Sequence, residues 1–146
     1  MIRNCVRLAA VAAAAWSGSA LVASAQSFDG AWKGQMTCAK LSFAKGTQKV
    51  PLTLSIAGGK ATFTRDVYSR DNTKVVGTEH GSGTIASDGA VTLASTYKGP
   101  NPEMTYTASY TGSIKGSAAS LSGTQVWTYK GKTENRPCTI ALSRGQ

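Results

Sequence analysis

The sequence predicts an all-β protein, a single eight-stranded antiparallel up-and-down barrel whose first and last strands are linked by a disulfide. Three observations predict it. After residue 25 the chain is dense in Thr, Ser, Gly, Val and Tyr, and its apolar residues recur at every second position. This alternation is typical of an antiparallel sheet with one solvated face. Turn-forming residues divide this part of the chain into eight segments, and two cysteines lie near the ends of the set.

Residues 1–25 are predicted to be a secretory signal peptide. Arg3 and Arg7 give a basic start, an Ala-rich apolar stretch follows, and Ala23-Ser24-Ala25 matches an A-x-A cleavage site. Cleavage near Ala25 leaves residues 26–146 as one β-barrel domain that is periplasmic or secreted. After the signal no apolar run approaches the roughly 18 residues that span a bilayer, so we expect no transmembrane segment.

Turn chemistry and the alternation of apolar residues set the strands. Gly58-Gly59 predicts a two-residue hairpin turn in which both residues need positive φ, and this turn places Ile56 opposite Ala61 on the apolar face. Ser87-Asp88-Gly89 predicts a three-residue turn with the glycine in the left-handed region. The eight predicted strands are residues 28–39, 50–57, 60–69, 75–86, 90–97, 105–115, 119–129 and 135–144.

Cys38 and Cys138 decide whether the sheet is open or closed. Bonded cysteines have Cα atoms roughly 4.4–6.8 Å apart, so the first and last strands must be close together. If these strands pair antiparallel with the cysteines opposite each other, Trp32 lies opposite Arg144. Between these two pairs, the inward-facing residues of one strand then lie opposite the inward-facing residues of the other. This agreement favours a closed barrel. The alternative is a two-sheet sandwich, which a disulfide can also bridge.

The chain resembles the calycins, the superfamily of lipocalins, avidins and fatty-acid-binding proteins. Gly30-Ala31-Trp32 matches the G-x-W of their first strand, and Arg144 lies where such barrels place a basic residue over that tryptophan. The resemblance implies that Trp32 and Arg144 form a cation–π pair at the closed end. The chain is also similar to small exported bacterial β-barrel proteins of unassigned function, a likeness that implies no activity.

Lipocalin-like barrels have one sealed end and one end rimmed by loops, and the predicted connections show the same asymmetry. The short turns lie at the Trp32 end. Residues 41–44 in the first long loop are either a lid or simply a cap on the core. The long loops predicted at the opposite end are residues 40–49, 70–74, 98–104 and 130–134.

Polar residues on the inward phase are the candidate ligand contacts, because a buried polar group costs free energy unless it finds a partner. The connection at 70–74 places Arg65 directly opposite Glu79. This is either a charged pair in a ligand cavity or a buried salt bridge in which the two side chains serve only as each other's partners. An aromatic lumen with a few polar anchors is how small-molecule pockets are usually lined. The candidate ligand-binding residues are Arg65, Glu79, Tyr97, Tyr106, Tyr110, Gln125 and Trp127, with Ser95 on the same phase.

Glycines on the inward phase bear on whether the lumen has room. They either leave space for a ligand, or permit sharp coiling and let a neighbouring aromatic ring lie across the strand. These glycines are Gly34, Gly77, Gly81, Gly83, Gly112 and Gly123.

The sequence offers little for catalysis. The single histidine, His80, is on the outward phase, both mature cysteines are used by the disulfide, and no nucleophile–base arrangement is recognisable. We therefore expect no enzyme activity, no cofactor and no metal site. Removing Arg3 and Arg7 from the 16 basic residues leaves 14 against 7 acidic ones, a net charge of +7. This charge is either a generic solvated surface or an attraction to lipid phosphates or acidic polymers.

Two functions follow as hypotheses. The first is a non-catalytic, calycin-like binding module that holds a small apolar or aromatic ligand at its open end. The alternative is an interaction or inhibitor-type envelope protein that acts through its surface loops while the barrel core is filled. The expected partners are a small molecule, or else an envelope protein or an acidic polymer. We expect no nucleic acid, because the lysines do not run together as a patch.

Overall fold

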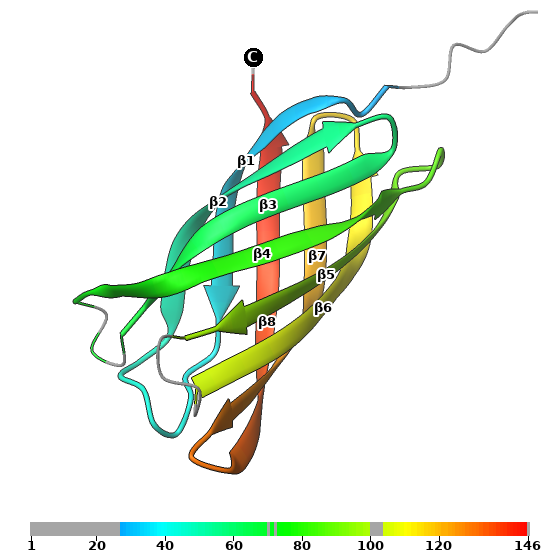
Figure 1. Cartoon of the computed structure of the whole chain (residues 1–146). Helices are drawn as coiled ribbons and strands as arrows, with labels where there is room; N and C mark the ends of the chain where they lie inside the picture. The colour runs from blue at the N-terminus through cyan, green and yellow to red at the C-terminus, as the bar shows by residue number, and fades with distance from the viewer. Residues whose placement is uncertain (1–26, 70, 72, 100–103, 146) are drawn as a thin grey trace, which may run out of the picture.

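The computed structural model describes residues 27–69, 71, 73–99 and 104–145, so the predicted signal peptide lies outside the described residues. Eight antiparallel strands follow one another in chain order around a closed barrel (Figure 1). This confirms the predicted fold class and excludes the two-sheet sandwich. Within the described part of the chain, no helix is long and apolar enough to cross a membrane. The strands are β1 (Gly30–Cys38), β2 (Gln48–Ala57), β3 (Lys60–Tyr68), β4 (Val75–Ile85), β5 (Ala90–Lys98), β6 (Met104–Lys115), β7 (Ala118–Tyr129) and β8 (Lys132–Arg144).

The core is formed by one face of every strand. In β2 and β5, buried and exposed residues alternate along almost the whole strand, as expected when one face of an antiparallel sheet packs inward and the other meets water. The Gly58-Gly59 turn has both residues at positive φ, 56° and 73°, and Gly89 has φ 86°. Ile56 lies opposite Ala61, so the predicted turns and the register that follows from them are confirmed.

One predicted connection is wrong. Residues 130–134 were expected to form a long loop, but β7 and β8 are joined by a two-residue turn, Lys130-Gly131, and β8 begins at Lys132. Lys130 adopts positive φ, 48°, which is uncommon for a residue other than glycine. The longer connections at this end of the barrel, which we call the loop end, are therefore 39–47, 69–74 and 99–103, of which residues 70, 72 and 100–103 lie outside the described part.

Pairing between β1 and β8 closes the barrel. Cys38 lies opposite Cys138 and is bonded to it, and the register continues to Trp32 opposite Arg144. Both cysteines are buried. The pairing predicted from the cysteines is therefore confirmed along the whole of the seam.

Trp32 and Arg144 seal the other end, where the turns at 58–59, 86–89 and 116–117 and the C-terminus lie (Figure 1). Trp32 is fully buried, and its indole Nε1 donates to the carbonyl of Phe28 at 2.9 Å. The Arg144 guanidinium lies 5.9 Å from the centre of the Trp32 ring. It also donates to the carbonyls of Ser27, at 3.1 Å, and Asp29, at 2.5 Å. The predicted pair thus holds the chain before β1 across the closed end.

The ladder of backbone pairs is incomplete on both sides of the β3–β4 hairpin. Although all residues of these strands are described, β2 and β3 pair only over the three positions next to their turn, from Ser55–Thr62 to Ala57–Lys60. On the other side, β4 and β5 pair only from Ile85–Val91 as far as His80–Thr96. The part of the hairpin nearest the loop end is paired within itself, and β4 extends past its neighbours there (Figure 1).

The disulfide should be a large part of the stability of this barrel. It joins residues 100 positions apart, and closing a loop of that length in the unfolded chain is worth about 4 kcal/mol in the chain-entropy model. We expect Cys38→Ser to lower the melting temperature markedly while the far-ultraviolet circular dichroism spectrum of the folded protein stays unchanged. Unchanged melting of the wild-type protein under reducing conditions would argue against this contribution.

Candidate functional site

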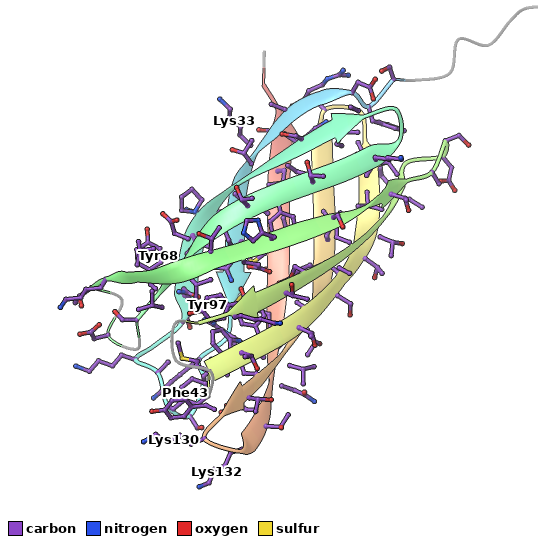
Figure 2. All side chains as sticks on the ribbon, in the orientation of Figure 1. Lys33, Phe43, Tyr68, Tyr97, Lys130 and Lys132 are labelled. Carbon is purple, nitrogen blue, oxygen red and sulfur yellow. A yellow bond between two sulfur atoms is a disulfide. The ribbon has the colours of Figure 1, made fainter. Side chains whose placement is uncertain are left out.

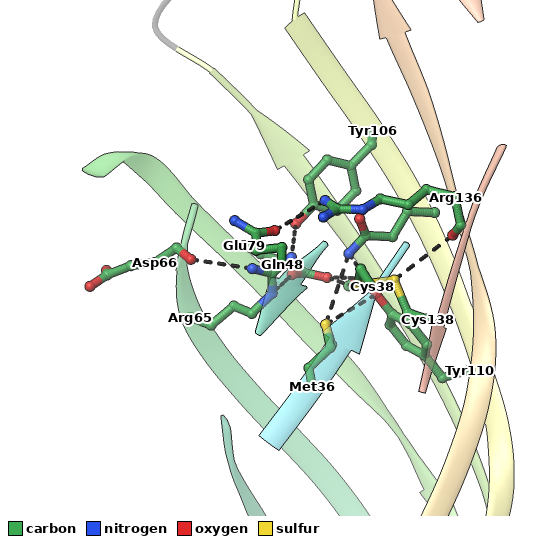
Figure 3. Close-up of polar contacts among 12 residues, drawn as sticks. Met36, Cys38, Gln48, Arg65, Asp66, Glu79, Tyr106, Tyr110, Arg136 and Cys138 are labelled. Carbon is green, nitrogen blue, oxygen red and sulfur yellow. Dashed lines mark hydrogen bonds and ion pairs between the residues drawn. A yellow bond between two sulfur atoms is a disulfide. The ribbon is translucent and has the colours of Figure 1, made fainter. Parts of the chain in front are cut away.

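A buried ion pair lies at the centre of the barrel (Figure 3). Arg65 on β3 and Glu79 on β4 are opposite each other, as predicted, and their side chains form a salt bridge. Arg65 also donates to the Tyr106 hydroxyl at 3.1 Å. The Ser95 hydroxyl donates to the Glu79 carboxylate. Each charge therefore has both an ionic partner and a hydrogen-bonding partner, which a buried charge requires.

A second set of polar side chains continues from Glu79 toward β7. The Trp127 indole donates to the side-chain oxygen of Gln125 at 2.9 Å, and the side-chain nitrogen of Gln125 donates to the Tyr110 hydroxyl at 3.0 Å. The Tyr110 hydroxyl in turn lies 3.5 Å from a Glu79 oxygen. The structure thus brings together in one network the polar residues that the sequence placed on the inward phase.

This network spans the region where the backbone ladder is incomplete. Arg65 reaches β6 through Tyr106, Glu79 reaches β5 through Ser95, and the Tyr97 hydroxyl donates to the carbonyl of Val76 at 3.3 Å. Side-chain contacts therefore fasten the loop-end half of the β3–β4 hairpin to the barrel in place of strand pairing. This supports the structural interpretation of the Arg65–Glu79 pair.

Aromatic rings fill the barrel between this network and the loop end. Tyr97 and Tyr106 stack with ring centres 5.2 Å apart, and the Tyr106 and Trp127 centres are 4.3 Å apart. Phe43, from the 39–47 loop, lies edge-on to Trp127 at 6.0 Å and stacks on Tyr129 at 5.0 Å. These five residues are called the aromatic cluster below.

The inward glycines accommodate close neighbours and leave no space for a ligand. A Cβ on Gly81 would lie 2.1 Å from the Phe63 ring, and one on Gly123 would lie 1.9 Å from the carbonyl oxygen of Ser109. Of the two interpretations left open by the sequence, coiling of the strands and packing of aromatic rings is the one observed. The lumen is filled by the protein's own side chains.

Open space begins at the loop end. A cavity of about 30 Å³, which we call the inner cavity, is bordered by Leu41, Trp127 and Arg136 among others. It has room for about two water molecules. A wider depression of about 440 Å³, the loop-end groove, lies outside it. The two spaces share Phe43, Lys45, Ser69 and Met104, and the groove is completed by Asp71 and Val76.

The first loop caps the core in this structure. Leu41 is buried. Ser42 donates its backbone N–H to both Glu134 oxygens, at 2.9 and 3.1 Å, and its hydroxyl to one of them at 2.6 Å. These hydrogen bonds hold the pKa of the Glu134 carboxyl below its usual value. Leu41, Ser42 and Phe43 all contact the barrel, so the loop packs as a cap and not as a separate lid.

Arg136 borders the inner cavity and is absent from the candidate residues predicted from the sequence. Its side chain is buried. The guanidinium donates to the carbonyl of Ala39 at 2.7 Å and to the side-chain oxygen of Gln48 at 3.0 Å. Burial, together with the nearby charge of Arg65, lowers the pKa of Arg136 to about 10. The signal that would have found it is its position two residues before Cys138, on the same inward phase.

Lysines gather around the loop end more than their dispersed positions in the sequence indicated. Figure 2 shows Lys130 and Lys132 beside Phe43 at this end, with Lys33 at the other. The acidic residues nearby in the described chain include Asp71, held by Ser69 and Thr73, and Glu134, held by Ser42. His80 is exposed, and among the described residues no three His, Cys, Asp or Glu side chains gather as a metal site would require. The exposed lysines in the loops and strand ends here include Lys40, Lys45, Lys49, Lys74, Lys98, Lys130 and Lys132.

The ion pair gives the first prediction of this site. We expect Glu79→Gln to lower the free energy of unfolding by about 3–5 kcal/mol, because it leaves the Arg65 charge buried without a carboxylate. The double variant Arg65→Met/Glu79→Leu should be more stable than Glu79→Gln alone. Urea denaturation measures both, with the exposed Asp66→Asn as a control expected to stay within about 0.5 kcal/mol of wild type. If Glu79→Gln left the free energy of unfolding unchanged, this would contradict a structural role for the Arg65–Glu79 pair.

The buried tyrosines give a second prediction. Burial, reinforced by the Glu79 charge, raises the pKa of Tyr110 to about 12, and burial also raises the pKa of Tyr106. The pKa of these tyrosines in the folded protein lies above the unfolded value of about 10. Their contribution to the free energy of unfolding is therefore fully present below pH 10. It is lost as the pH rises from about 10 to 12. Tyrosinate absorbance should therefore show fewer tyrosines ionising near pH 10 in the folded protein than in urea. In the Tyr110→Phe variant, one of the tyrosines that ionise at higher pH should be missing. Simultaneous ionisation of all five tyrosines in the folded protein would refute it.

Comparison with known proteins adds no family to this description. No protein-family model matches the chain, no curated protein matches it, and no solved structure matches it. The features held in common with the calycins are the closed eight-stranded antiparallel barrel and the contact between Trp32 and Arg144.

Proposed function

We propose that the protein is a non-catalytic binding module that holds a small apolar or aromatic ligand at the loop end of its barrel. The observation that carries this proposal is the loop-end groove, whose volume of about 440 Å³ lies within the range of small-molecule sites. Its lining combines the apolar side chains of Phe43, Val76 and Met104 with the polar side chains of Lys45, Ser69 and Asp71. Apolar walls with a few polar groups are the usual lining of such sites.

We place the proposed ligand in the groove and not in the lumen. The network of Arg65, Glu79 and Gln125 and the rings of the aromatic cluster occupy the interior of the barrel. The inner cavity of about 30 Å³ has room for a small group of a ligand but not for the whole of it. Tyr97, Tyr106 and Trp127 then support the floor of the site from below, and Phe43 contacts the ligand directly.

The disulfide and the engagement of the charged side chains support two further parts of the proposal, export from the cytoplasm and binding without catalysis. A disulfide between Cys38 and Cys138 is expected in an oxidising compartment, which supports export to the periplasm or beyond. The exposed His80 and the full engagement of Glu79 with Arg65 and Ser95 support a protein that binds and does not catalyse.

A second function is favoured by the filled lumen and by the lysines at the loop end. A solid barrel that presents Lys40, Lys74, Lys98, Lys130 and Lys132 on one end suits an interaction or inhibitor-type envelope protein that acts on an acidic partner. Charge of one sign around a surface accelerates such an association and makes it sensitive to salt.

Titration with the neutral apolar dye N-phenyl-1-naphthylamine tests the first function. We expect saturable binding with an increase in dye fluorescence. Phe43→Ala should weaken binding about tenfold, because it removes an aromatic contact. Phe28→Ala, at the closed end of the barrel, is the matched control and should leave binding unchanged.

The same protein distinguishes the two functions. Absence of saturable binding by the dye and by chemically diverse apolar ligands would exclude the first. Tight association with polyglutamate that weakens steeply with salt, and that the dye does not affect, would favour the second.

A further inference from the structure

We propose that Arg136 is an oxyanion-binding subsite at the base of the loop-end groove, and that the ligand is therefore an aromatic or apolar carboxylate. This inference rests on the proposed function, because it names the chemical class of the ligand in the same groove. Three observations carry it: an excess of buried positive charge, the neutral partners of the guanidinium, and the cavity beside it.

The first observation is the charge balance inside the barrel. Among the described residues the buried charged side chains are Arg65, Glu79 and Arg136, and Arg136 is 4% exposed. Glu79 is fully engaged with Arg65, Ser95 and, more distantly, Tyr110. The buried side chains therefore carry one more positive than negative charge, and Glu134, the carboxylate whose charge acts on Arg136, lies outside this buried set. A buried charge is costly unless it is paired, so a negative group bound here would be favoured.

The second observation is the chemistry of the partners. Arg136 donates through Nε to the carbonyl of Ala39 and through one terminal nitrogen to Gln48, and both acceptors are neutral. The nearest acidic residue along the strand, Glu134, accepts hydrogen bonds from Ser42, and it acts on Arg136 through its charge. A guanidinium has five N–H donors in a planar fork that matches a carboxylate. Donors beyond these two hydrogen bonds are therefore available for a ligand.

The third observation is the position of the space. The inner cavity is bordered by Arg136, Leu41 and Trp127. A volume of about 30 Å³ accommodates about two water molecules, which is close to the room that two carboxylate oxygens need. Because the inner cavity and the loop-end groove share Phe43 and Met104, a carboxylate beside Arg136 leaves the apolar body of the ligand against these two side chains.

The charge on Arg136 persists under ordinary conditions. Although burial lowers its pKa to about 10, the guanidinium is protonated at neutral pH. The lysines at the rim of the same end, among them Lys45 and Lys130, attract an anion toward the groove. Recognition by Arg136 and attraction by the rim then act on the same ligand charge.

A matched pair of ligands tests the proposal on the wild-type protein. 1-Naphthaleneacetate and 2-(1-naphthyl)ethanol have the same aromatic body and differ in the oxyanion. Each competes with N-phenyl-1-naphthylamine at neutral pH. We expect the carboxylate to bind at least about tenfold more tightly, which is the lower bound for a hydrogen bond to a charged group. Equal affinities would overturn the proposal without any variant.

Variants separate recognition from structural support. Arg136→Gln should abolish the preference for the carboxylate and leave the affinity for the alcohol within about twofold. Arg136→Lys should restore part of the preference, and Lys132→Gln, which removes an exposed cation from the same end, should keep most of it. An Arg136→Gln variant that weakens both ligands equally, or that keeps the preference, would overturn the subsite. Failure of the dye itself to bind wild-type protein would instead reject the proposed function.

Discussion

The pairing of the first strand with the last is the constraint on which the rest of the structure depends. With Cys38 fixed opposite Cys138, the sheet has to close, and closure turns one face of every strand into an interior. Arg65, Glu79 and Gln125 are then surrounded on all sides, whereas on an open sheet their face would meet water. Their mutual hydrogen bonds, the packing of the aromatic rings and the cation–π contact at Trp32 are all consequences of that closure.

Closure is not uniform around the barrel, and the polar interior explains how the fold tolerates this. Where β3 loses its pairing with β2, and β4 with β5, contacts from Arg65 to Tyr106 and from Ser95 to Glu79 take over. Such contacts depend on direction, so they hold the hairpin at one position in a way that apolar packing alone does not. The same arrangement concentrates charge near the loop end, where Arg136 lies.

The sequence predicted the parts of this structure that follow from periodicity and turn chemistry. The registers of Cys38 with Cys138 and of Arg65 with Glu79 followed from counting residues across the connections, because side chains on a strand repeat every two residues. The Lys130-Gly131 turn was not predictable, since a lysine at positive φ has no sequence signature. Arg136 was predictable in the same way as these registers, because it lies two residues before Cys138 on the inward phase of the predicted strand 135–144. Its burial and its contacts with Ala39 and Gln48, however, depend on how the first loop packs. The filled lumen depends on how Phe63 lies over Gly81, which is a matter of tertiary packing.

The interrupted ladder on both sides of the β3–β4 hairpin also bears on how the barrel comes apart. Closed barrels have no free edges to pair with other chains, but here two short stretches of edge flank a single hairpin, whose tip carries Val75 at 53% exposure. Local opening proceeds where the fewest backbone hydrogen bonds must break. We therefore expect partial unfolding to begin at this hairpin, while β1, β7 and β8, held by the disulfide and by continuous pairing, persist as the last cooperative unit. Exchange of the amide hydrogens in the loop-end half of β3 and β4 would report this opening. A strand of a second chain could pair with the sheet at the same edges.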